Sequence, residues 1–303
     1  MKIAQIKHDF GSGKVDAYRW RNSDGSASGI VAASATVADS AVIGCGASIG
    51  EGASIGPGAS VGGGASVGDH ARIGDHARIG DGAAISPDAI IGEGAVIGDM
   101  AVIGYRATIG AYASIGDRAS IGYRARIVAE ATIGTYARIG DGAVISPDAV
   151  IGYGAVIGRG ARIVLAVINP DATIGDGAVI SPGAVIGYGA SIGAFASVGA
   201  YARIGYRASI GPEAIIGDDA DIEAADWHMA GACGSRGATW TAVHSREHGL
   251  RWWVGCQRGI TTDDLLAAVQ ETHGDNEHAQ AYRHAVQYVT THPEYLRRIA
   301  QED

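Results

Sequence analysis

Residues 43–54 read Ile-Gly-Cys-Gly-Ala-Ser-Ile-Gly-Glu-Gly-Ala-Ser, a six-residue phrase that occurs twice in succession. The phrase is an aliphatic residue, usually Gly, two variable residues, a small residue that is nearly always Ala, and one more variable residue. It continues from about Val31 to Asp226. Six is not a multiple of the helical period, but it fits short strands and tight corners repeated around a coil. An internal repeat of this length predicts a β-solenoid.

Three sides of six residues would stack positions that are 18 apart, so Ile43, Val61, Ile79 and Ile97 should form one inward ladder. We expect the aliphatic and Ala positions to point inward, and the Gly of the second position to permit corner conformations that a Cβ would oppose. Because a single coil leaves both of its backbone edges unpaired, stability must come from stacking.

This repeat resembles that of the hexapeptide family of left-handed parallel β-helix proteins, over roughly two thirds of the chain. The resemblance implies the left-handed coil and a tendency to form trimers with parallel axes. It is weak for function, because the fold is shared by acyltransferases, γ-class carbonic anhydrases, nucleotidyltransferase domains and purely structural proteins.

The repeat keeps its register from Val31 to Ile163, with no loop inserted at any corner. The next step, from Ile163 to Ile168, takes five residues instead of six, after which the phase holds to Ile222. We expect a tightened corner or local bulge at residues 164–167 and about eleven coils. At about 4.8 Å per stacked strand, the rod would be on the order of 50 Å long.

The two ends of the chain depart from the repeat. Residues 1–30 contain two short strands, at about 2–6 and 15–20, and we expect a hairpin that caps the first coil. The solenoid would then occupy residues 31–226. Residues 227–303 hold most of the histidines and four of the five tryptophans, which predicts a small α+β domain for recognition or docking.

Within that C-terminal region, residues 239–243 and 250–254 alternate as in a hairpin. Helices are expected from Thr261 or Thr262 to about His273 and from Glu277 to Thr291. The phrases at residues 234–236, 255–256 and 273–278 are faintly similar to a phage or prophage module of unknown role.

The formal net charge of the chain is −9, and carboxylates crowd the corners of the early coils. This charge disfavours nucleic acid as a partner. No apolar run reaches membrane-spanning length and no signal peptide is recognisable, so we expect a cytoplasmic protein without a membrane partner. Cys45, Cys233 and Cys256 lack the paired spacing of a disulfide framework or a CxxC zinc site.

The outward strand positions offer an apolar stripe. Val150, Val167 and Val185 fall on one face in consecutive coils once the missing residue is allowed for. Exposed β-branched stripes are typical of subunit contacts, so the sequence predicts a homo-oligomer, and the resemblance favours a trimer.

Tyrosines and arginines occur at the corners in pairs that are 18 residues apart. Tyr105-Arg106 precedes Tyr123-Arg124 by 18 residues, and Tyr188 precedes Tyr206 by the same interval. Each pair should stack on one edge, either as a ligand clamp or as packing over the Gly-rich corners.

The resemblance implies that an acyltransferase would use a histidine at a subunit interface as general base. Only His70 and His76 qualify within the coils. They occupy equivalent slots of the phrases Gly68–Arg72 and Gly74–Arg78, six residues apart, and so lie on adjacent corners. The coils do not supply the three converging imidazoles of a γ-class carbonic anhydrase. His244–His248 matches the HxxEH pattern of inverted zinc peptidases, but it falls in a predicted hairpin loop rather than on a helix.

From the residues we favour a non-enzymatic structural or binding scaffold, an oligomeric β-helix that displays a C-terminal interaction module and is encoded by a phage. No cofactor or metal is expected. One alternative is an acyltransferase that uses His70 or His76 across a trimer interface with an acyl-coenzyme A donor. Another is the capture of a small anionic ligand by the Arg and Tyr residues at the subunit edges.

Overall fold

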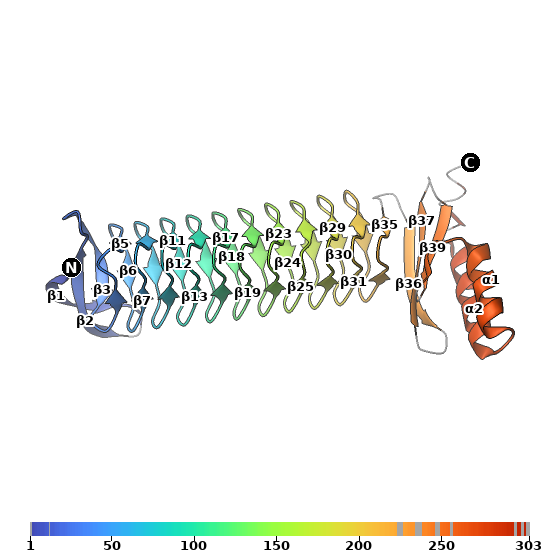
Figure 1. Cartoon of the computed structure of the whole chain (residues 1–303), viewed down its shortest axis with the longest axis horizontal. Coiled ribbons are helices and arrows are strands. Elements are labelled where there is room, and N and C mark those ends of the chain that lie inside the picture. The colour runs from blue at the N-terminus through green and yellow to red at the C-terminus, as the bar shows by residue number, and fades with distance from the viewer. Residues whose placement is uncertain are drawn as a thin grey trace.

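The computed structural model shows a rod of stacked coils with antiparallel strands at its N-terminal end and a strand and helix region at the other end (Figure 1). The structure describes residues 2–11, 13–222, 227–233, 238–245, 249–254, 257–293, 296–297 and 300.

The first face of the rod is a 13-stranded sheet, which we call sheet A. Two longer strands precede its eleven solenoid strands. In spatial order the strands are β1 (Lys2–Asp9), β2 (Lys14–Arg21), β3 (Ala27–Ala32), β6 (Ser48–Ile49), β9 (Ser66–Val67), β12 (Ala84–Ile85), β15 (Val102–Ile103), β18 (Ser120–Ile121), β21 (Arg138–Ile139), β24 (Val156–Ile157), β27 (Thr173–Ile174), β30 (Ser191–Ile192) and β33 (Ser209–Ile210).

The other two faces are 11-stranded sheets of two-residue strands. Sheet B contains β4 (Thr36–Val37), β7 (Ser54–Ile55), β10 (Arg72–Ile73), β13 (Ile90–Ile91), β16 (Thr108–Ile109), β19 (Arg126–Ile127), β22 (Val144–Ile145), β25 (Arg162–Ile163), β28 (Val179–Ile180), β31 (Ser197–Val198) and β34 (Ile215–Ile216). Sheet C contains β5 (Val42–Ile43), β8 (Ser60–Val61), β11 (Arg78–Ile79), β14 (Val96–Ile97), β17 (Ser114–Ile115), β20 (Thr132–Ile133), β23 (Val150–Ile151), β26 (Val167–Ile168), β29 (Val185–Ile186), β32 (Arg203–Ile204) and β35 (Asp221–Ile222).

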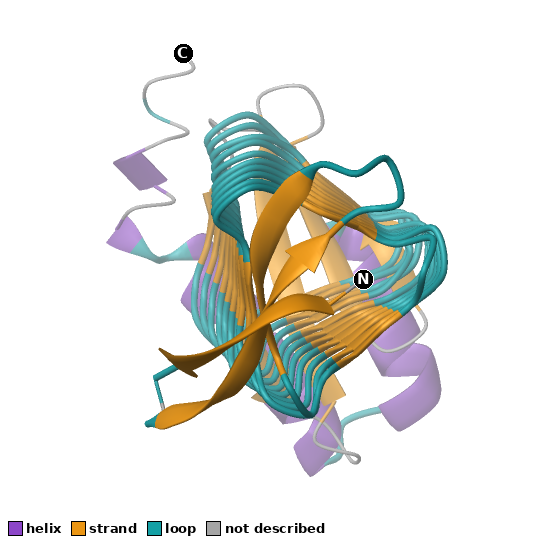
Figure 2. Cartoon of the chain, turned by 90° about the vertical axis from the view of Figure 1, so that its left-hand side faces the viewer, coloured by secondary structure: helices purple, strands orange, loops and turns teal. Residues whose placement is uncertain are grey.

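The core of the rod is the ladder of aliphatic and Ala residues that the repeat predicts. Parallel pairing places Val61 beside Ile43 and Ile79, and all three side chains are almost fully buried. The Ala of each phrase is buried as well. Viewed along the rod, three flat faces meet at three rows of turns (Figure 2). The prediction of a β-solenoid with about eleven coils is therefore confirmed.

In the structure, the Gly of the second position has a different role from the one that the sequence suggested. Positive φ occurs at the fourth position of the phrase, where residues other than Gly also adopt it, among them His70 and His76 at 57°. The second-position Gly instead allows close approach between coils, because a Cβ on Gly44 would lie 2.5 Å from the backbone of Gly62.

The missing residue is absorbed at one turn without loss of register. Leu165 takes a φ of 43° between β25 and β26. Val150 still pairs with Val167, and Val167 pairs with Val185. The tightened corner is thus confirmed, and the ladder continues because only the turn is shortened.

The N-terminal hairpin covers the first coil, as predicted. β1 and β2 pair antiparallel, β2 pairs antiparallel with β3, and these strands lie across the end of the rod (Figure 2). Trp20 packs on the solenoid core. The buried Asn22 amide exchanges two 3.0 Å hydrogen bonds with the backbone N–H and C=O of Ile43. It thereby takes the place of a further strand at that edge of sheet C.

The C-terminal region is a four-stranded antiparallel sheet with two helices. The strands, in order, are β36 (Trp227–Cys233), β37 (Ala238–Ser245), β38 (Gly249–Val254) and β39 (Gln257–Ile260). The helices are α1 (Thr262–His273) and α2 (Glu277–Thr290), capped by Thr261 and Asn276. The predicted hairpin and both helices are confirmed. No helix among the described residues is long and apolar enough to span a membrane.

This sheet packs between the last coil and the helices (Figure 1). On its solenoid side, Val243 joins the buried core of the rod and Trp253 packs beside it. On its other side, Trp240 and Trp252 contribute to a second core with both helices. The C-terminal region therefore closes the end of the solenoid.

Candidate functional site

The turns of the solenoid form three edges, which we name after the sheets that they join. The A–B edge holds His70, between β9 and β10, and the B–C edge holds His76, between β10 and β11. Both side chains are exposed. Each imidazole lies over a Gly of the preceding coil, His70 over Gly52 and His76 over Gly58. The two histidines are thus built alike but are not brought together, as their spacing predicted.

The surroundings of His76 include two residues that sequence reasoning missed. The next position up the edge is Gly94, and the ring of Tyr112 lies over it. The Tyr112 hydroxyl donates a 2.9 Å hydrogen bond to Glu93, and this bond raises the pKa of Tyr112. The interval of 18 residues between Gly94 and Tyr112 could have indicated this stack. It places a phenol and a carboxylate on the same edge as His76.

The A–B edge has a different set of neighbours. Asp88 follows His70 in the ladder, and its carboxylate forms a 3.4 Å ion pair with Arg106. A hydrogen bond to Asp88 raises the pKa of Tyr105. The rings of Tyr105 and Tyr123 stack with centroids 5.8 Å apart and an interplanar angle of 10°.

The third edge, C–A, carries a near copy of this arrangement. Tyr188 and Tyr206 stack at 5.7 Å and 11°. A hydrogen bond to Asp171 raises the pKa of Tyr188, and the guanidinium of Arg207 lies 5.2 Å from the Tyr206 ring centre. The expected stacking of both tyrosine pairs is therefore present, on two different edges. Their role in binding a ligand stays a prediction.

The predicted valine stripe lies on sheet C. Val150, Val167 and Val185 occupy adjacent parallel strands, and their side chains point outward. The same face carries exposed Val42 and Val96 nearer the N-terminus. Sheet C adjoins the B–C edge of His76, whereas the A–B edge of His70 lies at the opposite corner of the coil. Of the two histidines, only His76 therefore lies at an edge of sheet C, which we call the valine face; the stripe of Val150, Val167 and Val185 lies several coils further along the rod.

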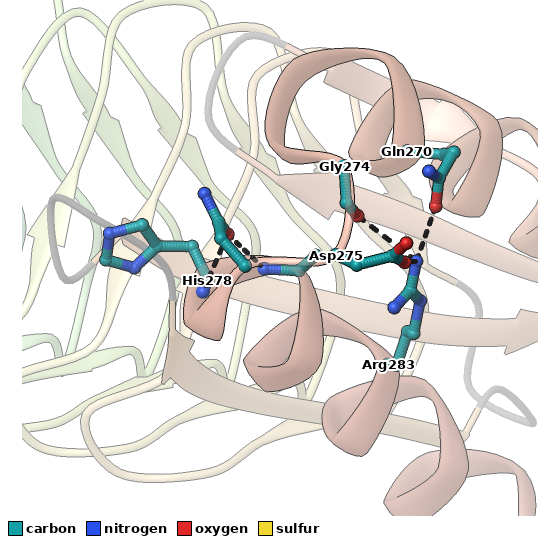
Figure 3. A network of polar contacts seen from close by, with 7 residues as sticks. Gln270, Gly274, Asp275, His278 and Arg283 are labelled. Atoms are coloured by element: carbon teal, nitrogen blue, oxygen red, sulfur yellow. Dashed lines mark hydrogen bonds and ion pairs between the residues drawn. The ribbon is translucent and has the colours of Figure 1, made fainter.

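A polar network between the two C-terminal helices has a structural role. Arg283 of α2 donates hydrogen bonds to Gln270 of α1, to the carbonyl oxygen of Gly274 and to Asp275 (Figure 3). These contacts fasten the loop between the helices. Across the residues that the structure describes, no three His, Cys, Asp or Glu side chains gather as a metal site would require.

Three of the motifs considered in this region lie wholly or partly outside the described residues. They are residues 234–236, 255–256 and 246–248, the last of which belongs to the HxxEH match. His244, the first residue of that match, is buried in β37.

Comparison with protein families identifies the repeat. Residues 46–81 and 70–105 match the family model of the bacterial transferase hexapeptide (six repeats). Residues 127–202 match that of the GMPPB C-terminal domain. Both histidines lie in residues 70–81, where the two hexapeptide matches overlap. No curated protein matches the sequence. The resemblance of the C-terminal region to a phage module receives no support from these matches.

Solved structures with similar coils include a UDP-N-acetylglucosamine acyltransferase, with a TM-score of 0.47 and 18% identity over 60% of this chain and 70% of that chain. The acetyltransferase domain of PglB from Neisseria gonorrhoeae gives a TM-score of 0.29 and 28% identity over 37% of this chain and 51% of its own. The UDP-N-acetylglucosamine acyltransferase of Arabidopsis gives 0.30 and 12% over 87% and 98%.

The expectation of a non-enzymatic scaffold is wrong. The match of the repeat to the bacterial transferase hexapeptide overturns it and favours the alternative, a transferase. The sequence argument failed because the repeat indicates the fold, and this fold is shared by transferases and purely structural proteins.

Proposed function

Because its solenoid belongs to the hexapeptide-repeat β-helix family, we propose that the chain is an acyltransferase that moves an acyl group from a thioester to a hydroxyl or amine. The observation that carries this proposal is the transferase hexapeptide match at residues 46–105, which contains both candidate histidines. Acyl-coenzyme A is the expected donor. UDP-N-acetylglucosamine, which gives two of the enzymes with similar coils their names, is the first acceptor to test.

We assign the general base to His76 rather than His70. The family resemblance implies a base at a subunit interface, and His76 is the histidine that borders the valine face of sheet C. Its imidazole would take the proton of the acceptor hydroxyl while the oxygen attacks the thioester carbonyl. The carbon–sulfur bond then breaks, and the imidazolium returns the proton to the departing thiolate.

This assignment rests on a homo-oligomer, for which we propose a trimer whose contacts use Val150, Val167 and Val185. The exposed valines support this contact, since β-branched side chains in adjacent strands form a flat apolar surface. A cytoplasmic location fits the proposal, because acyl thioester donors are made in the cytoplasm.

The assignment is tested by comparing His76→Ala with His70→Ala. The two sites match in sequence context, φ and exposure, so the pair separates catalysis from folding. We expect His76→Ala to lower the rate of acyl transfer by about 10²- to 10⁴-fold, as loss of a general base does, and His70→Ala to retain the wild-type rate. The readout is thiol release from acyl-coenzyme A together with the mass of the acylated acceptor.

The possible results separate the function from the residue. Loss of activity in His70→Ala alone would move the base to the A–B edge and leave the activity in place. Wild-type protein that releases no thiol with any acyl chain length or any hydroxyl or amine acceptor would overturn the function itself.

A further inference from the structure

The arginines of the middle coils gather along one edge of an acidic protein. The net charge is −9, yet six arginines lie on the A–B edge or on the strands that adjoin it. Arg106, Arg124 and Arg159 stand on the turns themselves. Arg126, Arg138 and Arg162 belong to the flanking strands β19, β21 and β25. With coils about 4.8 Å apart, these six fall within roughly 15 Å along the rod.

Two of these arginines are neutralised by carboxylates and four are not. Arg106 pairs with Asp88 at 3.4 Å, and Arg159 pairs with Asp176 at 2.9 Å. Asp141, the third carboxylate on this stretch of the edge, accepts the backbone N–H of Tyr123 at 2.7 Å. Within the described part of the chain, the others form no ion pair: Arg124, Arg126, Arg138 and Arg162. The result is a local excess of positive charge, which attracts anions.

Arg124 lies at the centre of this excess, and its guanidinium lies over an aromatic ring. The carbon of its guanidinium lies 5.0 Å from the centre of the Tyr123 ring, and Tyr123 stacks on Tyr105. When a guanidinium lies over an aromatic ring, the N–H groups in the plane of the guanidinium stay free to donate hydrogen bonds. Their geometry matches two oxygens of an oxyanion. The Tyr123 ring is therefore engaged by both Tyr105 and Arg124.

We propose that the A–B edge around Arg124 is a binding site for a phosphate or pyrophosphate group. Arg124 provides the oriented guanidinium, and Arg126 and Arg138 supply further positive charge from the two adjoining sheets. Guanidinium groups bind phosphate bidentately, through charge-assisted hydrogen bonds. The site is independent of the base on the B–C edge and of whether the chain transfers acyl groups.

The chain provides a matched control in Arg118. Its guanidinium also covers a tyrosine ring, with a distance of 5.5 Å to the centre of Tyr136, and also contacts the Tyr136 hydroxyl. Arg118 lies on the C–A edge, however, beside the stacked carboxylates Asp81, Asp99 and Asp117. Asp99 accepts the backbone N–H of Asp81, and Asp117 accepts that of Asp99. Replacing Arg118 removes the same charge and the same kind of contact from acidic surroundings.

The test is calorimetric titration of the full-length protein with inorganic phosphate, pyrophosphate and uridine diphosphate at low ionic strength. We expect Arg124→Gln to weaken pyrophosphate binding by about tenfold or more, the equivalent of one charge-assisted hydrogen bond, and Arg118→Gln to leave it unchanged. Arg126→Gln should give a smaller loss. Thermal unfolding of each variant verifies that it is folded.

The ligand series identifies the source of the phosphate. Equal affinity for pyrophosphate and uridine diphosphate would assign the site to the free anion, and tighter binding of uridine diphosphate would assign it to a phosphate ester. An absence of binding by the wild-type protein, or equal losses in Arg124→Gln and Arg118→Gln, would overturn the proposal. Neither result depends on catalytic turnover, so the phosphate-site proposal is tested separately from the acyltransferase proposal.

Discussion

The hydrogen bond between the Tyr105 hydroxyl and Asp88 links the ionisation of one residue to the folded state. The phenol donates to the carboxylate only while it is protonated, so the bond raises the pKa of Tyr105 above its usual value of 10.0. A group whose pKa is raised on folding adds stability at pH values below its unfolded pKa. That stability is lost as the pH rises through the folded pKa.

We therefore expect Asp88→Asn to lower the pH at which Tyr105 ionises. The measurement is the ultraviolet absorbance of tyrosinate during alkaline titration. Tyr105→Phe is the control, because it removes the titration of Tyr105 and leaves Tyr112 and Tyr188, whose pKa values are also raised. If the titration of Asp88→Asn superimposed on that of the wild type, the hydrogen bond would not hold in solution.

The strands of sheet C carry the proposed subunit contact. Val167 of β26 lies in the middle of the valine stripe and is 38% exposed in the single chain. Replacing it with Lys would place an unpaired charge in the contact, and burying such a charge is costly. We expect Val167→Lys to raise the dissociation constant of the assembly by about 100-fold or more without unfolding the coils.

Val156→Lys provides the matched control for this change. Val156 has the same exposure of 38% but lies on β24 of sheet A. Light scattering gives the mass of each variant, and circular dichroism reports on the coils. An unchanged mass for Val167→Lys, or equal dissociation of both variants, would refute the assignment of the contact to sheet C.

At the scale of the whole molecule, both ends of the solenoid are covered. The N-terminal hairpin closes one end through Trp20 and Asn22, and the C-terminal sheet closes the other through Val243 and Trp253. An uncovered coil would present unpaired backbone groups and aliphatic side chains, which favour association with other coils. The C-terminal region thus has a structural role, because it closes the end of the rod. Its docking to a protein partner stays a prediction. The division into residues 1–30, 31–226 and 227–303 is likewise a prediction.

Deleting residues 227–303 should expose the last coil and cause end-to-end association. We expect particles of increasing length in light scattering and electron microscopy, whereas the full-length protein keeps one size. Val243→Asp is a milder test of the same cap, because it keeps the C-terminal region but places a carboxylate against the core of the rod. A truncated protein with the same oligomer mass as the full-length chain would show that the C-terminal sheet is not needed as a cap.

The sequence by itself determined the solenoid, its number of coils and the tightened corner, because a six-residue period fixes which residues are buried and which stack. It also predicted the N-terminal cap and the stacking of Tyr105 on Tyr123, whereas it assigned the C-terminal region to recognition or docking and not to closing the rod. These are consequences of local pattern and of the interval between coils.

Only the tertiary structure decided how separate phrases share an edge. The phrases of His70 and His76 are near copies, so local pattern could not distinguish them. Their positions around the coil place one at the A–B edge and the other beside the valine face. The docking of Val243 on the last coil, the hydrogen bond of Tyr112 to Glu93 and the gathering of arginines around Arg124 follow from contacts between distant residues. The sequence contains these residues, but three-dimensional packing brings them together.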